Sequence, residues 1–325
     1  MLTRRQAFST GAALLATALP SPLRAANGAC RRRCLPIRDG RLRLASGRCL
    51  SYREYGNDPD APLVFYFHGT PGSRLELGLC DEESCYSGAR VVSVDRPGMG
   101  CSTYYDNRCI THWPQDIEQL AAALGHGDKP LGIIGMSGGA PYAAACAHQI
   151  PHRLTHVAIV SGHAPMNACG TCPGNQDKQI ELISSRPRLG KLAFRLIGRG
   201  LDRKPDKVIQ FVSKNWSAAD RKLMLCNSKH YCQLIANLRE AKRCGPAGMV
   251  KDIGLLAGCW GFCLSQIRGV PVSIWQGGCD PVVTPSMGRY FHRQIADSEL
   301  IIDSCAGHVT MFKWHAREIF SRFLI

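Results

Sequence analysis

Ser137 lies at the junction of an apolar run and an Ala-rich run, with glycines on both sides at 135 and 139. The apolar run 131–136 is too short for a helix, whereas the Ala-rich run has a helical pattern. A G-x-S-x-G spacing between strand and helix makes a sharp turn that exposes the serine above a sheet. The unpaired N–H groups and positive dipole end of the helix point at the same place. The pattern predicts a serine placed for nucleophilic attack, although five such letters also arise by chance among 33 glycines.

A serine hydroxyl is a weak nucleophile, so it needs a base to take its proton and a third group to orient that base. Asp280 directly follows one predicted strand and His308 follows the last one, which gives the chain order Ser, Asp, His. In an open parallel sheet all three would lie at the carboxyl ends of strands, where ligands bind. Asp280 can also cap a turn, and His308 is one of 11 histidines. Asp297 and Asp303 are weaker candidates, because they lie at the start of and within the last predicted strand.

Segments typical of strands and helices alternate through most of the chain, which predicts an α/β fold with a mostly parallel sheet and crossover helices. A β-hairpin is predicted at 41–55, buried strands at 62–67, 89–94, 131–136, 154–161, 270–275 and 299–302, and helices at 114–124, 284–295 and 310–324. Between 165 and 267 the alternation stops, and basic amphipathic patterns at 178–185, 188–197, 206–214, 218–226 and 231–242 predict helices. We therefore expect a core formed by 40–164 and 268–325, with 165–267 as a helical cap.

The composition is that of a globular protein with an excess of basic residues. The 325 residues are 45% hydrophobic and carry a formal charge of +15. No nucleic-acid-binding pattern accompanies the charge, so a basic solvated surface is favoured over nucleic-acid binding. Residues 1–26 place Arg4 and Arg5 before a mildly apolar run too short to span a bilayer, which resembles a twin-arginine export signal. We expect an exported protein, periplasmic or extracellular; the alternative is a basic terminus of a cytoplasmic enzyme.

Seventeen cysteines are spread along the chain, and eight of them form four isolated close pairs, at 30/34, 80/85, 169/172 and 259/263. None of these pairs has a second pair at zinc-finger spacing, so no metal site is expected. Cys169 and Cys172 form a C-x-x-C pair, but it lies in a Gly/Pro/Asn loop and does not open a helix. A local disulfide or two free thiols is therefore favoured there over a redox pair.

Five motifs resemble those of the α/β-hydrolase superfamily in order and spacing. They are His68-Gly-Thr-Pro-Gly-Ser-Arg74, Asp95-Arg-Pro-Gly-Met-Gly-Cys-Ser102, Gly135-Met-Ser-Gly-Gly-Ala-Pro-Tyr142, Gly277-Gly-Cys-Asp280 and Gly307-His308. The resemblance covers about residues 40–325 and implies a capped serine hydrolase without a cofactor, acting on a small-molecule acyl substrate. It implies Ser137 as nucleophile, His308 as base, Asp280 as orienting carboxylate, and the backbone N–H groups of Thr70 and Gly138 as oxyanion hole.

The same resemblance leaves the substrate open, because in this superfamily the cap lines the pocket. A carboxylic ester hydrolase is the first expectation. A proline-type aminopeptidase or amidase is an alternative, but its His-Gly-Gly-Pro-Gly loop has Gly where this chain has Thr70. A non-catalytic binding protein of the same fold is a further alternative, and such a protein would have a damaged triad. The Thr70 side chain is expected to be incidental, His68 to be a packing residue, and the 95–102 loop to brace the turn at Ser137.

Overall fold

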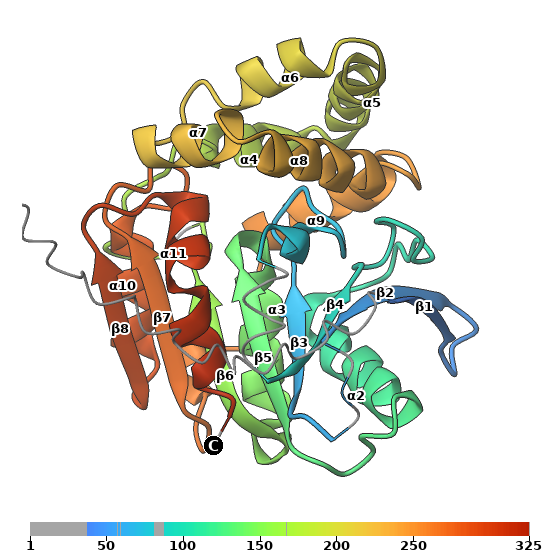
Figure 1. Ribbon diagram of the computed structural model, residues 1–325, viewed down its shortest axis with the longest axis vertical. Coiled ribbons are helices and arrows are strands. Elements are labelled where there is room, and N and C mark those ends of the chain that lie inside the picture. The colour runs from blue at the N-terminus through green and yellow to red at the C-terminus, as the bar shows by residue number, and fades with distance from the viewer. Residues whose placement is uncertain (1–37, 57, 59, 81–87, 167, 325) are drawn as a thin grey trace, which may run out of the picture. The chain divides into compact units, whose positions relative to one another are not determined.

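The computed structural model describes residues 38–56, 58, 60–80, 88–166 and 168–324. Within this part of the chain, eight strands form one sheet in the order β1-β2-β4-β3-β5-β6-β7-β8 (Figure 1). The strands are β1 (Arg38–Arg43), β2 (Cys49–Tyr55), β3 (Leu63–Phe67), β4 (Arg90–Val94), β5 (Leu131–Met136), β6 (Leu154–Val160), β7 (Val272–Gly277) and β8 (Ser298–Asp303). The hairpin β1–β2 joins β4 antiparallel, and all other neighbours are parallel. The predicted α/β fold with a mostly parallel sheet is confirmed.

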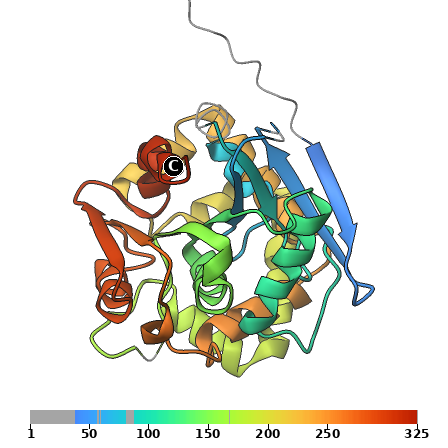
Figure 2. The same cartoon turned by 90° about the horizontal axis from the view of Figure 1, so that it is seen from below.

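The central strands are buried on both faces, which is why they are continuous apolar runs. Side chains alternate across the sheet: Ile133 packs with one core cluster and Ile134 with the other. Helices α2 (Trp113–Ala123), α3 (Ala140–Gln149) and α10 (Pro285–Gln294) cover the first face. Helix α11 (His308–Ser321) covers the second face (Figure 2). This helix begins two residues earlier than predicted, so His308 is its first residue.

In the described part of the chain, six helices lie between β6 and β7, and we refer to them together as the insertion. They are α4 (Asp177–Ser185), α5 (Pro187–Arg203), α6 (Pro205–Val212), α7 (Ala218–Leu225), α8 (Ser228–Ala241) and α9 (Ala247–Ala257). Helix α9 was not predicted, because Gly248 and Gly254 interrupt its helical pattern. Gly248 has a packing reason: a Cβ there would lie 2.1 Å from the Gly98 carbonyl oxygen. The helix therefore lies directly on the 95–102 loop.

A buried polar network joins α9 to α3 and to the loops that follow β3 and β4. The Asp252 carboxylate accepts hydrogen bonds from Arg96 at 2.7 Å, Arg108 at 3.0 Å, Tyr142 at 2.6 Å and the Thr70 hydroxyl at 2.6 Å. The side chains of Asp252 and Arg96 are fully buried, and that of Arg108 is 3% exposed. Burial would raise the pKa of Asp252, but the two guanidinium groups reverse this and hold it below its ordinary value. The carboxylate is therefore charged and compensates two buried cations.

Three further sequence predictions concern the export signal, the cysteines and a membrane span. The predicted export signal, 1–26, lies outside the described residues. All fourteen cysteines in the described part of the chain are free thiols, and Cys169 and Cys172 are both exposed. The described helices include none with the length and hydropathy needed to cross a bilayer.

Replacing Asp252 with Ala should destabilise the protein strongly, because it leaves Arg96 and Arg108 buried without a counter-charge. Breaking a buried ion pair in this way costs about 3–5 kcal/mol. Urea unfolding should show this loss, whereas Asp202→Ala should change stability by less than about 1 kcal/mol. Asp202 also forms an ion pair, in which its Oδ2 lies 2.7 Å from Nζ of Lys242, but its side chain is 53% exposed. Equal effects of the two substitutions would contradict the anchoring role of Asp252.

Candidate active site

The turn at Ser137 joins β5 to α3 through one short 3-10 turn, Ser137–Gly139. Ser137 has a φ of 52°, a left-handed conformation that is strained for a residue with a side chain. The flanking glycines permit the turn because no side chain fits there. A Cβ on Gly139 would lie 2.2 Å from the Phe67 carbonyl oxygen, and one on Gly135 would lie 2.6 Å from the Ala143 Cβ. The geometry agrees with the strand–turn–helix arrangement expected from the sequence.

Asp280 and His308 meet across the ends of β7 and β8. Nδ1 of His308 lies 2.7 Å from Oδ2 of Asp280, whose side chain is completely buried. The other carboxylate oxygen accepts the N–H groups of Val282 at 2.8 Å and Val283 at 3.0 Å, which fixes its orientation. The His308 side chain remains 14% exposed. One ring nitrogen is thus held by a carboxylate, and the other is left to act toward a ligand.

The loop after β6 forms hydrogen bonds to both Ser137 and His308. The carbonyl of Ser137 accepts the N–H of His163 at 3.2 Å, and the Ser161 hydroxyl donates to the His308 carbonyl at 3.0 Å. Among the described residues, no hydrogen bond joins the Ser137 hydroxyl to the His308 ring. Catalytic hydrogen bonds are often loose before substrate binds. The loop after β6 therefore connects the backbone of Ser137 to the backbone of His308.

Thr70 and Gly138 are in direct contact beside Ser137. A Cβ on Gly138 would lie 3.2 Å from the Thr70 nitrogen and 2.4 Å from its hydroxyl oxygen. The expectation that the Thr70 side chain is incidental is wrong, because its hydroxyl donates to Asp252 and accepts from Arg96 at 2.7 Å. These bonds fix the loop that carries the Thr70 N–H.

His68 is buried and belongs to the same loop. Its Nδ1 lies 2.7 Å from the Gly69 carbonyl oxygen, and its Nε2 faces the Arg96 N–H at 3.3 Å. Burial, reinforced by the charge of Arg96, lowers the pKa of His68 well below its ordinary value. The ring is therefore a neutral packing group, as the sequence suggested.

Asp220, from α7 of the insertion, caps the helix that begins at His308. Its Oδ2 accepts the N–H of His308 at 2.7 Å, and its Oδ1 accepts those of Val309 and Thr310 at 3.0 and 2.8 Å. These are N–H groups that a helix leaves unpaired, and a carboxylate there also complements the helix dipole. Gly307 is needed for this approach, since a Cβ would lie 2.2 Å from the carboxylate. No local sequence pattern points to this role, because Asp220 lies 88 positions from His308.

Glu76 is a further carboxylate near Ser137. The sequence did not suggest Glu76. Its Oε1 accepts the Gly69 N–H at 2.8 Å and the Tyr66 hydroxyl at 2.9 Å. A Cβ on Gly69 would lie 3.4 Å from both the other oxygen of Glu76 and the Ser137 Cβ. Burial raises the pKa of Glu76, although these two donors favour its charged form.

Carboxylates surround His308 on several sides, and they decide its titration. Burial of the ring disfavours the charged form. The negative charges of Asp280, Asp220 and Glu76 outweigh burial and raise the pKa of His308 above its ordinary value. A base with a raised pKa holds a transferred proton more tightly, which suits a group that accepts a proton and later returns it.

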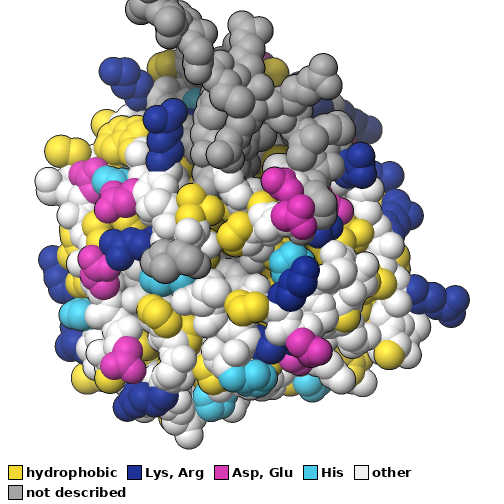
Figure 3. Space-filling view, turned by 60° about the horizontal axis from the view of Figure 1, so that its bottom comes forward, with side chains coloured by type: hydrophobic (Ala, Val, Ile, Leu, Met, Phe, Trp, Pro, Cys, Tyr) yellow, Lys and Arg dark blue, Asp and Glu magenta, His cyan; other side chains and the backbone are white. Residues whose placement is uncertain are grey.

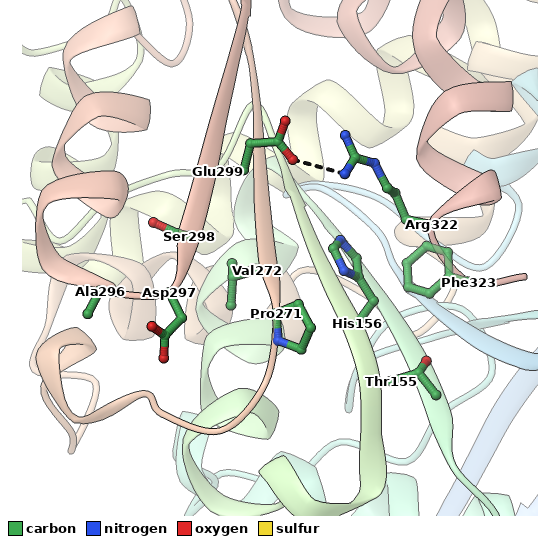
Figure 4. Close-up of a pocket in the computed structure, with 10 residues that line it drawn as sticks. All are labelled: Thr155, His156, Pro271, Val272, Ala296, Asp297, Ser298, Glu299, Arg322 and Phe323. Carbon is green, nitrogen blue, oxygen red and sulfur yellow. Dashed lines mark ion pairs between the residues drawn. The ribbon is translucent and has the colours of Figure 1, made fainter. Parts of the chain in front are cut away.

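The two weaker carboxylate candidates do not reach His308. Asp303, the last residue of β8, bonds to Nε2 of His315 at 2.9 Å. Asp297 lines a hollow of about 670 Å³ at the amino ends of β6, β7 and β8 (Figure 4). Parallel strands place that hollow at the opposite end of the sheet from Ser137. Its charged pair, Glu299 and Arg322, lies 2.9 Å apart, so the hollow is separate from the reacting loops.

Comparison with known proteins identifies the family. Residues 62–313 match the model of the alpha/beta hydrolase fold. The chain belongs to this family. Two pimeloyl-[acyl-carrier protein] methyl ester esterases, from serogroup C and serogroup A strains of Neisseria meningitidis, are each 25% identical to it over 221 residues. The match covers 67% of this chain in both comparisons. It covers 75% of the serogroup C protein and 62% of the serogroup A protein, which is less than two thirds of the latter.

Solved structures agree on the fold of this alpha/beta hydrolase family member. An esterase from Thermogutta terrifontis has a TM-score of 0.62 at 18% identity, covering 89% of this chain and 100% of that one. A hydrolase from Pseudomonas aeruginosa PA01 also has a TM-score of 0.62 at 18% identity, covering 87% and 95%. At this identity the likeness shows a shared fold and leaves the chemistry to the residues of the site.

Replacing Asp220 with Asn should lower the pKa of His308, because it removes a nearby negative charge while keeping an oxygen that can accept the helix N–H groups. Titration of the His308 ring protons by NMR would measure the shift. Asp303→Asn is the matched control, since that carboxylate contacts His315. An unchanged pKa of His308 in Asp220→Asn would show that the carboxylate acts on the helix alone.

The raised pKa of His308 also predicts how stability depends on pH. A histidine pKa above the unfolded value of about 6.5 adds stability that is fully present below that pH and is lost as pH rises through the folded pKa. Asp280→Asn should therefore destabilise the protein more at about pH 6 than at about pH 9. Urea unfolding at both pH values measures this, and an equal loss at both would contradict a charged Asp280–His308 pair.

Proposed function

We propose that the protein is a serine hydrolase that cleaves carboxylic esters through Ser137, His308 and Asp280. Membership of the alpha/beta hydrolase fold family and the named esterases among its relatives support hydrolysis of ester bonds in general. The observation that carries the residue assignment is the 2.7 Å contact between His308 and the buried Asp280, beside the strained turn at Ser137. A strained serine, an oriented imidazole and a fixed carboxylate are the parts that acyl transfer requires.

Asp280 accepts the Nδ1–H of His308 and so leaves Nε2 as the basic nitrogen. As the Ser137 oxygen attacks the ester carbonyl, Nε2 takes the serine proton. The charged imidazole is stabilised by Asp280 and then protonates the departing alcohol, which leaves an acyl-enzyme. Water repeats the sequence: Nε2 takes its proton, the acyl bond to Ser137 breaks, and the serine oxygen regains a proton as the acid is released.

Thr70 and Gly138 would hold the negative oxygen that forms during each attack. Both offer backbone N–H groups, which are fixed before the charge develops and so cost no reorganisation. Gly138 is at the start of the turn leading into α3, where N–H groups lack partners within the helix. The Thr70 backbone is held by the bonds of its hydroxyl to Asp252 and Arg96. The buried network would thus position one of the two donors.

The helical insertion, 165–267, would act as the cap that selects the substrate. Two of its carboxylates support this proposal: Asp252 bonds to the Thr70 loop, and Asp220 bonds to the start of the His308 helix. A cap tied to both sides of the site borders the space in which an acyl group must lie. The site needs no cofactor for this chemistry, since the nucleophile, base and donors are all protein groups.

Ser137→Ala should lower ester turnover by a factor on the order of 10⁴ or more, because no other group replaces the nucleophile. A panel of p-nitrophenyl esters of rising chain length, run beside amino-acid arylamides, measures the activity and separates esterase from aminopeptidase. Ser304→Ala, at an exposed serine, is the control.

A fluorophosphonate probe should label the wild type at Ser137 and leave Ser137→Ala unlabelled. A folded Ser137→Ala protein that still hydrolyses esters would refute the assignment. A wild type that neither turns over nor reacts with the probe would instead be a binding protein of this fold.

A further inference from the structure

The insertion exposes an unusual share of large apolar side chains. Ten such side chains are exposed in the described part of the chain, and six of them belong to α4, α5 and α6. They are Leu182, Leu189, Leu192, Leu196, Ile197 and Phe211, with exposed fractions between 37% and 69%. Figure 1 shows α5 and α6 on the side of the insertion away from the sheet. Single exposed apolar residues are normal, but a group of this size on adjoining helices indicates a contact surface.

Helix α5 carries most of this surface on one side. Leu189, Leu192 and Leu196 recur at spacings of three and four residues, so they form one row along the helix. Their exposed fractions are 53%, 52% and 56%. The side of α5 that packs inward is formed by Gly190, Gly198 and Leu201. The helix thus shows its leucine row to solvent, where a water-facing helix normally has polar residues.

A row of arginines runs beside the leucines. Arg188, Arg195 and Arg199 are exposed and lie on one flank of the leucine row at 100° per residue. None of the three forms an ion pair with a described residue. Residues 178–214 contain ten Lys and Arg against three Asp and Glu. Asp202 is already paired with Lys242 at 2.7 Å, and the cations of this segment outnumber its carboxylates, so the segment keeps a net positive charge.

The face of the molecule at the bottom of Figure 1 has a different distribution of charged side chains. Figure 3 brings that face forward and shows Lys and Arg interspersed with Asp, Glu and His, with apolar side chains scattered among them. On this face the cations are mixed with acidic groups, whereas Arg188, Arg195 and Arg199 on α5 lie beside a row of leucines.

We propose that this leucine–arginine face of α5, together with Phe211 of α6, docks on a lipid surface that carries anionic phospholipids. An amphipathic helix with leucines on one side and Lys or Arg beside them lies in the plane of a bilayer, with its apolar row at the boundary of headgroups and acyl chains. The arginines bind lipid phosphates at the same depth. The contact is peripheral, in keeping with the described helices, none of which could cross a bilayer.

The charge of the leucine–arginine face favours a bilayer over a second copy of the chain as its binding partner. A symmetric dimer through this face would bring two sets of the same arginines together, and like charges across an interface are strongly unfavourable. A surface of anionic lipids supplies the opposite charge and an apolar layer at once. Nucleic acid would match the arginines but offers no apolar layer for the leucines.

The test is binding of the full chain to phosphatidylcholine vesicles with and without phosphatidylglycerol, measured by flotation. Wild type should float with the anionic vesicles, and added salt should weaken this binding. Leu189→Gln/Leu192→Gln/Leu196→Gln should lower the affinity at least about tenfold. Arg188→Gln/Arg195→Gln/Arg199→Gln should lower the affinity by a factor on the order of 100, since each cation near such a surface is worth roughly a fivefold change.

The control is Ile302→Gln/Trp314→Gln/Leu324→Gln, which removes three exposed apolar side chains elsewhere and should bind like wild type.

Hydrogen exchange of the wild-type protein tests the same proposal without a substitution. Peptides from 187–212 should gain protection when anionic vesicles are added. Protection confined to 1–26 would assign the binding to that segment and overturn the proposal. Wild-type levels of binding by the leucine variant would overturn it as well, as would no binding by wild type. A dimer of wild type that the leucine variant abolishes would make a second copy the occupant. Because none of these variants touches Ser137, His308 or Asp280, their outcome is independent of the proposed ester hydrolysis.

Discussion

Two arginines buried beside α3 impose the main constraint on this structure. Arg96 and Arg108 have almost no contact with water, so their charges must be met inside the protein. A single carboxylate, Asp252, meets both, and it comes from the last helix of the insertion. An uncompensated buried charge costs several kcal/mol, so α9 cannot separate from the sheet without a large loss of stability. The insertion and the sheet are therefore joined at the loop that carries Thr70.

A second carboxylate joins the insertion to the other side of the site. Asp220 binds the free N–H groups at the start of α11, and that helix begins with His308. The two contacts differ in kind. Asp252 balances charge in a closed polar cluster, whereas Asp220 satisfies helix N–H groups and adds negative charge near an imidazole. Together they make the insertion part of the framework that holds the site, in addition to any role in selecting a substrate.

Charge is distributed unevenly in a protein with a formal charge of +15. Acidic side chains gather around the candidate site, where Asp280, Asp220 and Glu76 raise the pKa of His308. Basic side chains gather on the outer helices of the insertion, where most face solvent without a partner of opposite sign. The acidic groups near the candidate site act on the proton affinity of His308 over a few ångströms. The basic groups on the insertion act on charged molecules that approach the protein. Net charge alone would not have separated these two roles.

The sequence by itself determined what depends on neighbouring residues: the apolar strands, the glycines around Ser137, and the loops after strands where Asp280 and His308 lie. Parallel strands end at one edge of a sheet, so chain order sufficed to bring those loops together. The sequence did not reveal α9, Asp252, Asp220, Glu76 or the bonds of the Thr70 hydroxyl. Asp252 bonds to a residue 182 positions away, and no local pattern reports such a partner. Only the tertiary structure decided which carboxylates meet the buried arginines and the His308 helix, because burial and opposite charge select partners by proximity in space.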